Sequence, residues 1–440
     1  MEKIQAILLD TILEWPRSPC YQVAYSGGLD STVLLHALNR VRERLPGALS
    51  AVHVNHGIHP DRGAWEAHCR RSCRELQLEM VTLAVEALPR TGASPEARAR
   101  DERYRVLAGH LGADHMLLTA HNRDDQAETL LLQLCRGAGS SGLAAMPALR
   151  RFGSGWHGRP LLGMERSLLR EYAQREELTW VEDDSNLDRR FDRNFIRHEI
   201  LGRLRSRWPG VSSTLSRAAG HQSQTVEILA EAAARDLQEC RDPGAGTLDL
   251  GRLQALSQAH QPNLLRHWIK GLELPVPDAA TVQRILDEAV NARPDAAPLV
   301  NWPGAEVRRY RQHLYASAPL PPHDPALTRS WRMQEACVLD CGSLTATAAL
   351  GIGLRMNACP DSGVVVRFRR GGEKIRPVGA RHRRELKTLL QEQGVPPWLR
   401  DRLPLLYVGS RLAAVAHLWV EADFAAGADE NGWRIHWTPA

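Results

Sequence analysis

Two short stretches of this 440-residue chain combine residue types that could handle phosphate and a metal ion. The first, SGGLDS (residues 26–31), places two glycines, two serines and an aspartate between apolar runs. Free backbone N–H groups in such a turn, together with the start of a helix, can hold an anion. Asp30 would repel a bare phosphate, so it predicts a Mg²⁺ ion between its carboxylate and phosphate oxygens. The simpler alternative is an ordinary glycine turn with no ligand.

The lysine of a Walker loop is missing from this stretch, and no GxxxxGK[ST] occurs anywhere in the chain. Two GxGxxG matches exist, GAGSSG (137–142) and GSGWHG (153–158). The first follows an expected helix and the second lies in an expected loop, whereas a dinucleotide site needs a strand before the motif and a helix after it. Neither match therefore predicts a dinucleotide cofactor.

The second stretch is AHNRDDQAET (residues 120–129), which carries His121, Asp125 and Glu128. Asp125 and Glu128 are three residues apart, on one face of the first turns of an expected helix. A single acidic residue there is explained by the helix dipole. Several carboxylates with a histidine at a strand end instead suit a divalent cation or a base for an amine nucleophile. His53 and His56 in HVNH could belong to the same site or be ordinary loop histidines.

The elements that must position these residues alternate between strands and helices. Strands are expected at 21–25, 48–56, 79–85 and 115–121, and helices from Thr32, at 65–76, at 95–111 and at 124–135. Four such β–α repeats predict an α/β fold, a parallel sheet with helices on both faces. Ligands bind beyond the carboxyl ends of the strands in such sheets, which is where these motifs lie.

The rest of the chain changes character. Residues 211–317 are expected to be mainly helical, ending in a hairpin with Pro-Gly at its turn. The stretch APLPPHDPA (318–326) holds four prolines and predicts a stiff, exposed linker. Residues 327–440 are expected to form a small α+β domain. With a catalytic domain over 1–210, the chain then has three domains.

Composition indicates a globular protein with a net charge of +5 and a pI of about 8.8. The eight cysteines include no CxxC pair, so scattered reduced thiols are favoured over a zinc site or a disulfide framework. The N-terminal MEKIQAILLDTILEW is amphipathic and acidic rather than a signal peptide. No apolar run approaches the roughly 20 residues that span a bilayer. We therefore expect a cytoplasmic protein that binds no membrane.

Ordered motifs along the chain resemble one enzyme family. SGGLDST is similar to the pyrophosphatase-type loop of the N-type ATP pyrophosphatases, the PP-loop superfamily. Further motifs narrow the resemblance to the tRNA(Ile)-lysidine synthetase family: HVNHGIH, SPEARARDERYRVL, TAHNRDDQAETLLLQLCRGAGSSGL, RPLL and WVEDDSNLDRRFDRNFIRHEIL. The run FRRGGEKIRPVGARHRRELKTLLQEQGVPPWLRDRLPLL resembles the last domain of the long form of that family. The resemblance covers roughly residues 20–210, 248–316 and 364–420.

The resemblance implies an ATP-dependent ligase that acts on an isoleucine tRNA with a CAU anticodon. ATP would adenylate the C2 oxygen of the wobble cytidine, and the ε-amine of free L-lysine would then displace AMP and form lysidine. Pyrophosphate leaves in the first step, so the glycine loop would hold it. A Walker lysine suits chemistry at the terminal phosphate, so its absence fits this reaction.

The resemblance also implies roles for individual residues. The loop residues would bind ATP: Ser26, Gly27, Gly28, Leu29, Asp30 (with Mg²⁺) and Ser31. Three residues would border the adenine pocket: His53, Asn55 and His56. Asp125 and Glu128 would bind the lysine ammonium or help to deprotonate it, and His121 would position the nucleotide or the target base. Arg197 would face the α-phosphate or the tRNA backbone, unless it is an ordinary surface arginine. Asn122 stands where some family members have a second histidine, so no chemistry is predicted there.

The C-terminal region holds a basic run, with nine Lys/Arg against two Glu between Arg367 and Lys387. Beside a tRNA-modifying domain such a run favours phosphate contacts, although a solvated surface is the simpler interpretation for an isolated chain. The residues expected to bind tRNA are Arg381, Arg383, Arg384, Lys387 and Trp398. Trp398 could stack on a base, or pack in the core.

Two alternatives remain open at the level of sequence. Another adenylating tRNA modifier, such as a thiolase, would be chemically close, but those that use an iron–sulfur cluster or a persulfide relay need paired cysteines. A non-catalytic RNA-binding module would not need Asp30, Asp125 and Glu128 together. The oligomeric state is not predicted.

Overall fold

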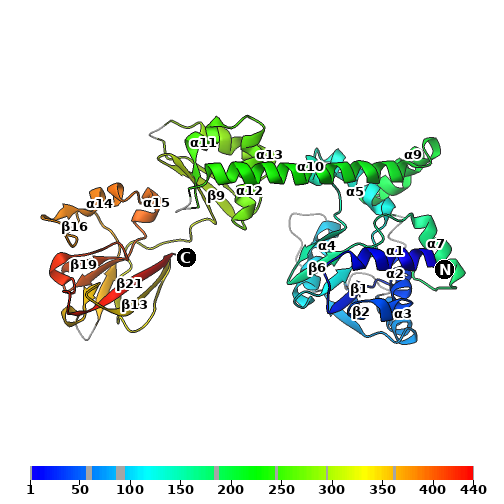
Figure 1. The fold of residues 1–440 in the computed structure, drawn as a ribbon, viewed down its shortest axis with the longest axis horizontal. Helices are drawn as coiled ribbons and strands as arrows, with labels where there is room; N and C mark the ends of the chain where they lie inside the picture. The colour runs from blue at the N-terminus through cyan, green and yellow to red at the C-terminus, as the bar shows by residue number, and fades with distance from the viewer. Residues whose placement is uncertain are drawn as a thin grey trace. The chain divides into compact units, whose positions relative to one another are not determined.

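The computed structural model describes residues 2–55, 62–85, 95–182, 188–242, 246–293, 296–359 and 363–439. The chain divides into two compact units, Met1–Leu229 and Ala230–Ala440, and the long helix α10 (Val211–Cys240) belongs to both (Figure 1). Within the described residues, every helix is too short or too polar to cross a membrane.

The first unit is built on a six-stranded sheet in the order β3-β2-β1-β4-β6-β5. Its strands are β1 (Cys20–Ala24), β2 (Ala48–Asn55), β3 (Met80–Ala84), β4 (Met116–Leu118), β5 (Leu149–Phe152) and β6 (Gly155–Gly158). All neighbouring pairs are parallel except β5–β6, which is antiparallel. The predicted parallel sheet is confirmed. The expected loop at 153–158 is wrong, because it contains the β5–β6 turn and all of β6.

Helices cover both faces of this sheet, because buried side chains alternate along its strands. Val23 and Met116 pack in one core with helices α1, α2, α3 and α7, whereas Ala24 and Leu117 pack in another core with α4. The helices of this unit are α1 (Glu2–Leu13), α2 (Leu29–Asn39), α3 (Arg62–Glu75), α4 (Pro95–His110), α5 (Arg123–Cys135), α6 (Ser140–Leu143), α7 (Arg166–Arg175), α8 (Asp192–Phe195), the π-helical turn η3 (Ile196–Ile200) and α9 (Leu201–Arg207).

The second unit begins with a mainly helical region that carries a small antiparallel sheet. Its helices are α11 (Leu250–Ala255), α12 (His260–Gly271), α13 (Ala279–Arg284) and the π-helical turn η4 (Ile285–Val290). The sheet has the order β7-β10-β9-β8, from β7 (Leu248–Asp249), β8 (Leu299–Trp302), β9 (Ala305–Tyr310) and β10 (His313–Ser317). The predicted Pro-Gly turn joins β8 to β9, with Gly304 at a φ of +85°.

The C-terminal region of the second unit consists mostly of antiparallel sheets. One sheet has the order β11-β15-β18-β19-β20 and another β12-β13-β21-β14, while β16 pairs with β17. The strands are β11 (Arg329–Trp331), β12 (Cys337–Leu339), β13 (Gly342–Leu350), β14 (Leu354–Arg355), β15 (Val364–Arg367), β16 (Lys374–Ile375), β17 (Arg384–Glu385), β18 (Leu405–Val408), β19 (Arg411–Val415), β20 (Trp419–Val420) and β21 (Asn431–Pro439). With helices α14 (Leu386–Glu392) and α15 (Pro397–Arg400), this confirms the expected α+β class.

Candidate functional site

The glycine loop connects β1 to α2 at the carboxyl edge of the parallel sheet. Gly27 has a φ of +82°, a conformation that favours glycine, and a Cβ at this position would lie 3.0 Å from the Sγ of Cys69. The hydroxyls of Ser26 and Ser31 lie 3.0 Å apart, and Ser31 also donates to the carbonyl of Gly28 at 3.0 Å. Helix α2 begins at Leu29 rather than at the predicted Thr32, so Asp30 and Ser31 lie in its first turn.

The Asp30 carboxylate is mostly buried, and within the described residues only one of its two oxygens has partners. Its Oδ2 accepts a hydrogen bond from the Asn122 side chain at 3.3 Å and lies 3.6 Å from Nε of Arg166. Its Oδ1 is buried and has no hydrogen-bond partner within the described residues. Burial raises the pKa of Asp30 to about 6, although Arg166 acts in the opposite direction. An unpaired buried carboxylate oxygen next to a glycine turn that could hold an anion fits a divalent cation.

Asn122 links the glycine loop to the acidic helix. It is the N-cap of α5, where its side chain accepts from the backbone N–H groups of Asp124 and Asp125. The carboxylate of Asp125 accepts in return from the backbone N–H of Asn122 at 2.9 Å, which completes a capping box. Asn122 is 1% exposed, and it also donates to Asp30. Sequence reasoning assigned no role to this residue, yet it connects both predicted motifs.

Asp125 and Glu128 are each bound by two arginines. Arg193 donates to Asp125 at 2.7 Å and to Glu128 at 2.8 Å. Arg197 donates to Asp125 at 3.2 Å and to Glu128 at 2.6 and 3.0 Å. The Glu128 side chain is only 1% exposed, and the arginine side chains are 23% and 21% exposed. The two positive charges of the arginines therefore neutralise the two negative charges of the carboxylates in a mostly buried cluster, as buried ions require.

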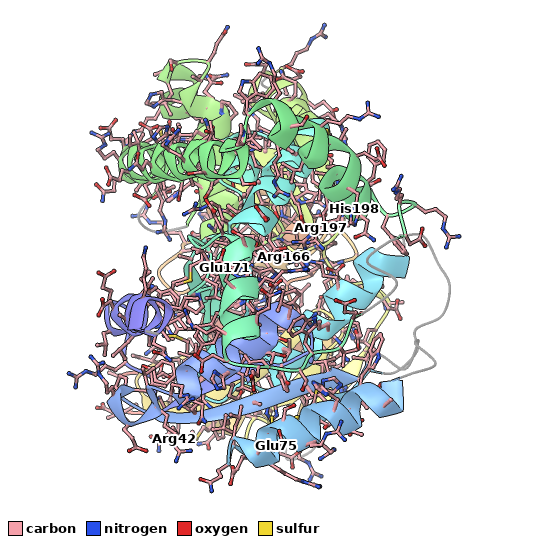
Figure 2. All side chains as sticks on the ribbon, turned by 90° about the vertical axis from the view of Figure 1, so that its right-hand side faces the viewer. Arg42, Glu75, Arg166, Glu171, Arg197 and His198 are labelled. Atoms are coloured by element: carbon pink, nitrogen blue, oxygen red, sulfur yellow. The ribbon has the colours of Figure 1, made fainter. Side chains whose placement is uncertain are left out.

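The arginines of this cluster come from α8 and η3, which follow residues 183–187 outside the described part of the chain. Arg193 and Arg197 are four residues apart, so both side chains project from one face of the helical segment. Figure 2 shows Arg197 with Arg166, which lies on α7 and contacts Asp30. Arg193 was not predicted. Its spacing from Arg197 in DRNFIR is the signal that could have identified it.

His121 lies three residues after the end of β4 and belongs to a buried chain of polar side chains. Its Nδ1 is 2.8 Å from the hydroxyl of Thr119, which lies 2.9 Å from Nε2 of His157. The Nδ1 of His157 is in turn 3.2 Å from the guanidinium of Arg159. Burial, assisted by Arg159, lowers the pKa of His157 to about 2 and also lowers that of His121. Both imidazoles are therefore neutral.

Of the three residues expected at the adenine pocket, two form hydrogen bonds within the protein and the third is not described. His53 is 6% exposed, and its Nδ1 bonds the carbonyl of Tyr25 at 2.9 Å. The side chain of Asn55 donates to Glu66 at 3.1 Å. His56 lies outside the described residues. The bonds of His53 and Asn55 are made to the protein itself, and neither bond by itself indicates a nucleotide pocket.

The predicted tRNA-binding residues lie in the second unit, and most of their side chains are exposed. Arg383 pairs with Glu421 and Asp423, each at 3.6 Å, and Arg384 pairs with Glu392. Arg381 and Lys387 are exposed. Trp398 is half-buried, with its ring edge-on to Tyr315 at 5.4 Å between centroids. The arginines of the basic run therefore differ: Arg369, Arg376, Arg383 and Arg384 form ion pairs within the protein.

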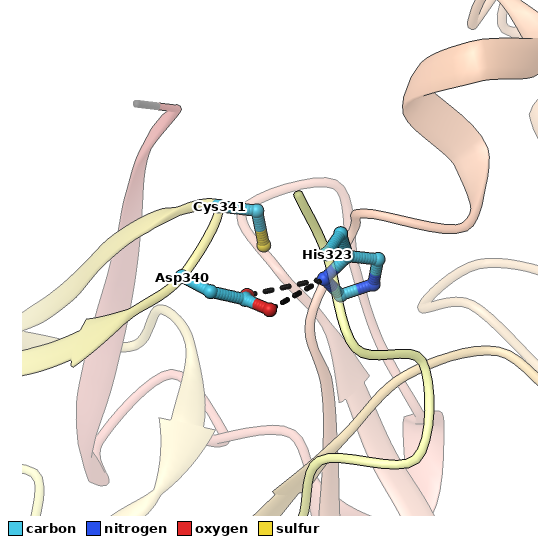
Figure 3. A group of neighbouring side chains, drawn as sticks. All are labelled: His323, Asp340 and Cys341. Atoms are coloured by element: carbon cyan, nitrogen blue, oxygen red, sulfur yellow. Dashed lines mark hydrogen bonds and ion pairs between the residues drawn. The ribbon is translucent and has the colours of Figure 1, made fainter. Parts of the chain in front are cut away.

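A pocket of about 540 Å³ adjoins Trp398, and Arg369, Arg370 and Arg402 are among its lining residues. His323, from the expected linker, lies at its wall. Figure 3 shows His323 with Asp340 and Cys341, whose potential metal-ligand atoms lie within 4.8 Å of one another. The imidazole of His323 already bonds the Asp340 carboxylate at 3.1 Å and the Asp401 carbonyl at 3.0 Å, and burial raises the pKa of Cys341 to about 12. This cluster therefore anchors the linker to the C-terminal region.

Comparison with known proteins gives a consistent result along the chain. Family models match as a PP-loop domain over residues 1–204, a TilS substrate binding domain over 248–315 and a TilS substrate C-terminal domain over 364–437. Three curated relatives carry the name tRNA(Ile)-lysidine synthase. The protein from Pseudomonas aeruginosa is 41% identical, over 99% of this chain and 97% of its own. Those from Methylococcus capsulatus and Coxiella burnetii are 41% and 40% identical, over 95% of this chain and 96% and 93% of their own.

Proposed function

The chain belongs to the tRNA(Ile)-lysidine synthase family and forms lysidine on an isoleucine tRNA with the use of ATP, and from this premise we propose how its residues divide the reaction. In the first step, the C2 oxygen of the wobble cytidine attacks the α-phosphate of ATP, and pyrophosphate leaves. In the second step, the ε-amine of lysine attacks C2, and AMP leaves with that oxygen. The tRNA has a CAU anticodon, and the reaction takes place in the cytoplasm.

The glycine loop holds the pyrophosphate in this proposal, with a Mg²⁺ ion on Asp30. The main support is the unpaired, buried Oδ1 of Asp30 beside the positive-φ turn at Gly27. When bound, Mg²⁺ would neutralise charge on the departing phosphates. Ser26, which is exposed, and the backbone N–H groups at the start of α2 would donate to the same oxygens. His53, Asn55 and His56 remain proposed neighbours of the adenine.

Asp125 and Glu128 bind the lysine substrate in this proposal, and Arg193 and Arg197 control their availability. All four carboxylate oxygens already accept hydrogen bonds, from the two arginines and from the backbone of Asn122. Such carboxylates suit the binding of a cation better than the removal of a proton. When ATP arrives, its α-phosphate offers the arginines a second anion. The arginines can then share or exchange partners, which leaves the carboxylates free for an ammonium group of lysine.

The second unit holds the tRNA in this proposal. Arg381, Arg383, Arg384 and Lys387 would contact phosphates, and Trp398 would contact a base or terminal nucleotide. The support is the exposed basic run and the arginine-lined pocket beside Trp398. Because Arg383 and Arg384 have acidic partners, Arg381 and Lys387 are the side chains that reach a phosphate without first breaking an ion pair found in the structure.

The experiment that tests the order of steps omits lysine. Protein, isoleucine tRNA and α-labelled ATP should release pyrophosphate and leave label on the tRNA. Addition of lysine should then release labelled AMP and form lysidine. Pyrophosphate release that requires lysine from the start would contradict a separate adenylation step. Label that appears on lysine rather than on tRNA would contradict the assignment of the activated oxygen.

A further inference from the structure

The buried chain of hydrogen bonds from Arg159 through His157 and Thr119 to His121 has a defined donor-to-acceptor direction, because Arg159 can only donate. The guanidinium of Arg159 has no lone pair to offer, so Nδ1 of His157 must accept its hydrogen bond. His157 is 0% exposed and neutral, so its single proton lies on Nε2. That N–H donates to the hydroxyl oxygen of Thr119 at 2.9 Å.

The Thr119 hydroxyl accepts from His157 and donates to His121. A hydroxyl has one proton, and within the described residues the Thr119 oxygen forms hydrogen bonds only with the two imidazoles. Since it accepts from His157, its own proton points at Nδ1 of His121, 2.8 Å away. If Nδ1 of His121 donated instead, the hydroxyl proton would lack an acceptor inside a buried site. Thr119 is 5% exposed, so water does not readily replace that acceptor.

The strands of the sheet place these residues together. Thr119 directly follows β4, and its backbone N–H donates to the carbonyl of Gly158 at the end of β6. In the register of the parallel pair, Leu117 lies opposite His157. Arg159 is fixed by a bond to the Pro147 carbonyl at 2.7 Å. This hydrogen-bond chain is therefore anchored at the ends of β4 and β6, and His121 is its last member.

We propose that Arg159, His157 and Thr119 are positioning residues that fix His121 as the neutral tautomer with its proton on Nε2. His121 then offers one N–H donor next along the chain from Asn122, which itself donates to Asp30 of the glycine loop. A donor there suits an oxygen of the reacting centre, either on the α-phosphate or on the cytosine. The same tautomer excludes His121 as the base for the lysine amine. Its Nδ1 lone pair is engaged by Thr119, and its Nε2 already carries a proton.

The target oxygen of His121 rests on the proposed function, but the tautomer does not, so the first measurement needs no activity. Full-length protein is labelled with ¹⁵N-histidine, and His121 is assigned by comparison with a His121→Gln variant. The ring-nitrogen shifts distinguish a protonated nitrogen from an unprotonated one. We expect a protonated Nε2 and an unprotonated Nδ1 at neutral pH. A protonated Nδ1 would overturn the proposal even in a fully active enzyme.

A pair of substitutions at Thr119 tests the consequence for catalysis. Thr119→Val keeps the shape and removes the hydroxyl, and it should lower kcat/KM by about tenfold or more, as loss of a positioned hydrogen bond in a buried site does. Thr119→Ser keeps the hydroxyl and should restore activity and the wild-type ring-nitrogen shifts. Thr11→Val on α1, whose hydroxyl bonds its own helix, is the matched control. Equal activity in Thr119→Val and wild type, or equal loss in Thr119→Ser and Thr119→Val, would contradict the proposed role of the Thr119 hydrogen bond.

Discussion

Replacement of Asp30 by asparagine should stabilise the protein while it removes activity. The folded state raises the pKa of this carboxyl from 3.8 to about 6, chiefly because the group is buried. A difference of about 2 in pKa corresponds to at most about 3 kcal/mol at 25 °C. The charged form of Asp30 therefore costs the fold up to about 3 kcal/mol near pH 8, and asparagine, which is neutral, avoids that cost.

The pH dependence gives this prediction its sign. Between about pH 4 and pH 6, the folded protein keeps a proton on Asp30 that the unfolded chain has already released. The contribution of Asp30 to wild-type stability should therefore fall as the pH rises through this window and stay reduced above it. The advantage of Asp30→Asn should be largest near pH 8 and should shrink toward zero near pH 4.

Urea unfolding in buffer without Mg²⁺, followed by circular dichroism at about pH 4.5 and about pH 8, measures this difference. Asp124→Asn is the matched control, because the Asp124 carboxylate already pairs with Arg205 at 2.7 Å and should gain nothing. Mg²⁺ with ATP should stabilise the wild type but not Asp30→Asn, since only the wild type has the carboxylate for the ion. If Asp30→Asn exceeded the wild type in stability by the same amount at both pH values, or not at all near pH 8, the claim that the charged Asp30 carboxylate destabilises the fold would be refuted.

Other substitutions test the remaining parts of the site. Glu128→Gln should raise the lysine KM or accumulate adenylated tRNA while ATP affinity is kept, as rapid-quench analysis of labelled tRNA can show; Asp124→Asn should do neither. Gly27→Ala should destabilise the fold by about 1–2 kcal/mol in chemical unfolding, because a side chain at its positive φ is strained, whereas Gly28→Ala, with an ordinary φ of −76°, should cost far less. Arg381→Ala should lower the log–log salt slope of tRNA binding by about 0.7 to 0.9 in a filter-binding series, and an unchanged slope would remove it from the interface. Lysine should bind more tightly when an ATP analogue is present, as calorimetry can measure; equal affinity without the nucleotide would contradict partner exchange by the arginines.

Sequence patterns predicted the elements of the first unit well, because strong apolar periodicity and glycine punctuation dominate its β–α repeats. They missed the β5–β6 hairpin, since GSGWHG is rich in glycine and carries little strand signal. The motif residues were found because their types are unusual at strand ends. Arg193, Thr119 and Arg159 were not, because nothing in a single sequence shows which distant side chains meet. Only the tertiary fold brings Arg193 to Glu128 or His157 to Thr119.

The assay of AMP release with each amino acid in turn tests the central claim most directly. Purified protein, ATP, Mg²⁺ and isoleucine tRNA with a CAU anticodon are incubated with each of the twenty amino acids, and free AMP and the modified nucleoside are measured. The proposed reaction predicts that lysine alone releases AMP in step with lysidine formation, and that the same tRNA without its wobble cytidine gives neither. AMP release that is independent of lysine, or lysidine formation without AMP, would contradict it.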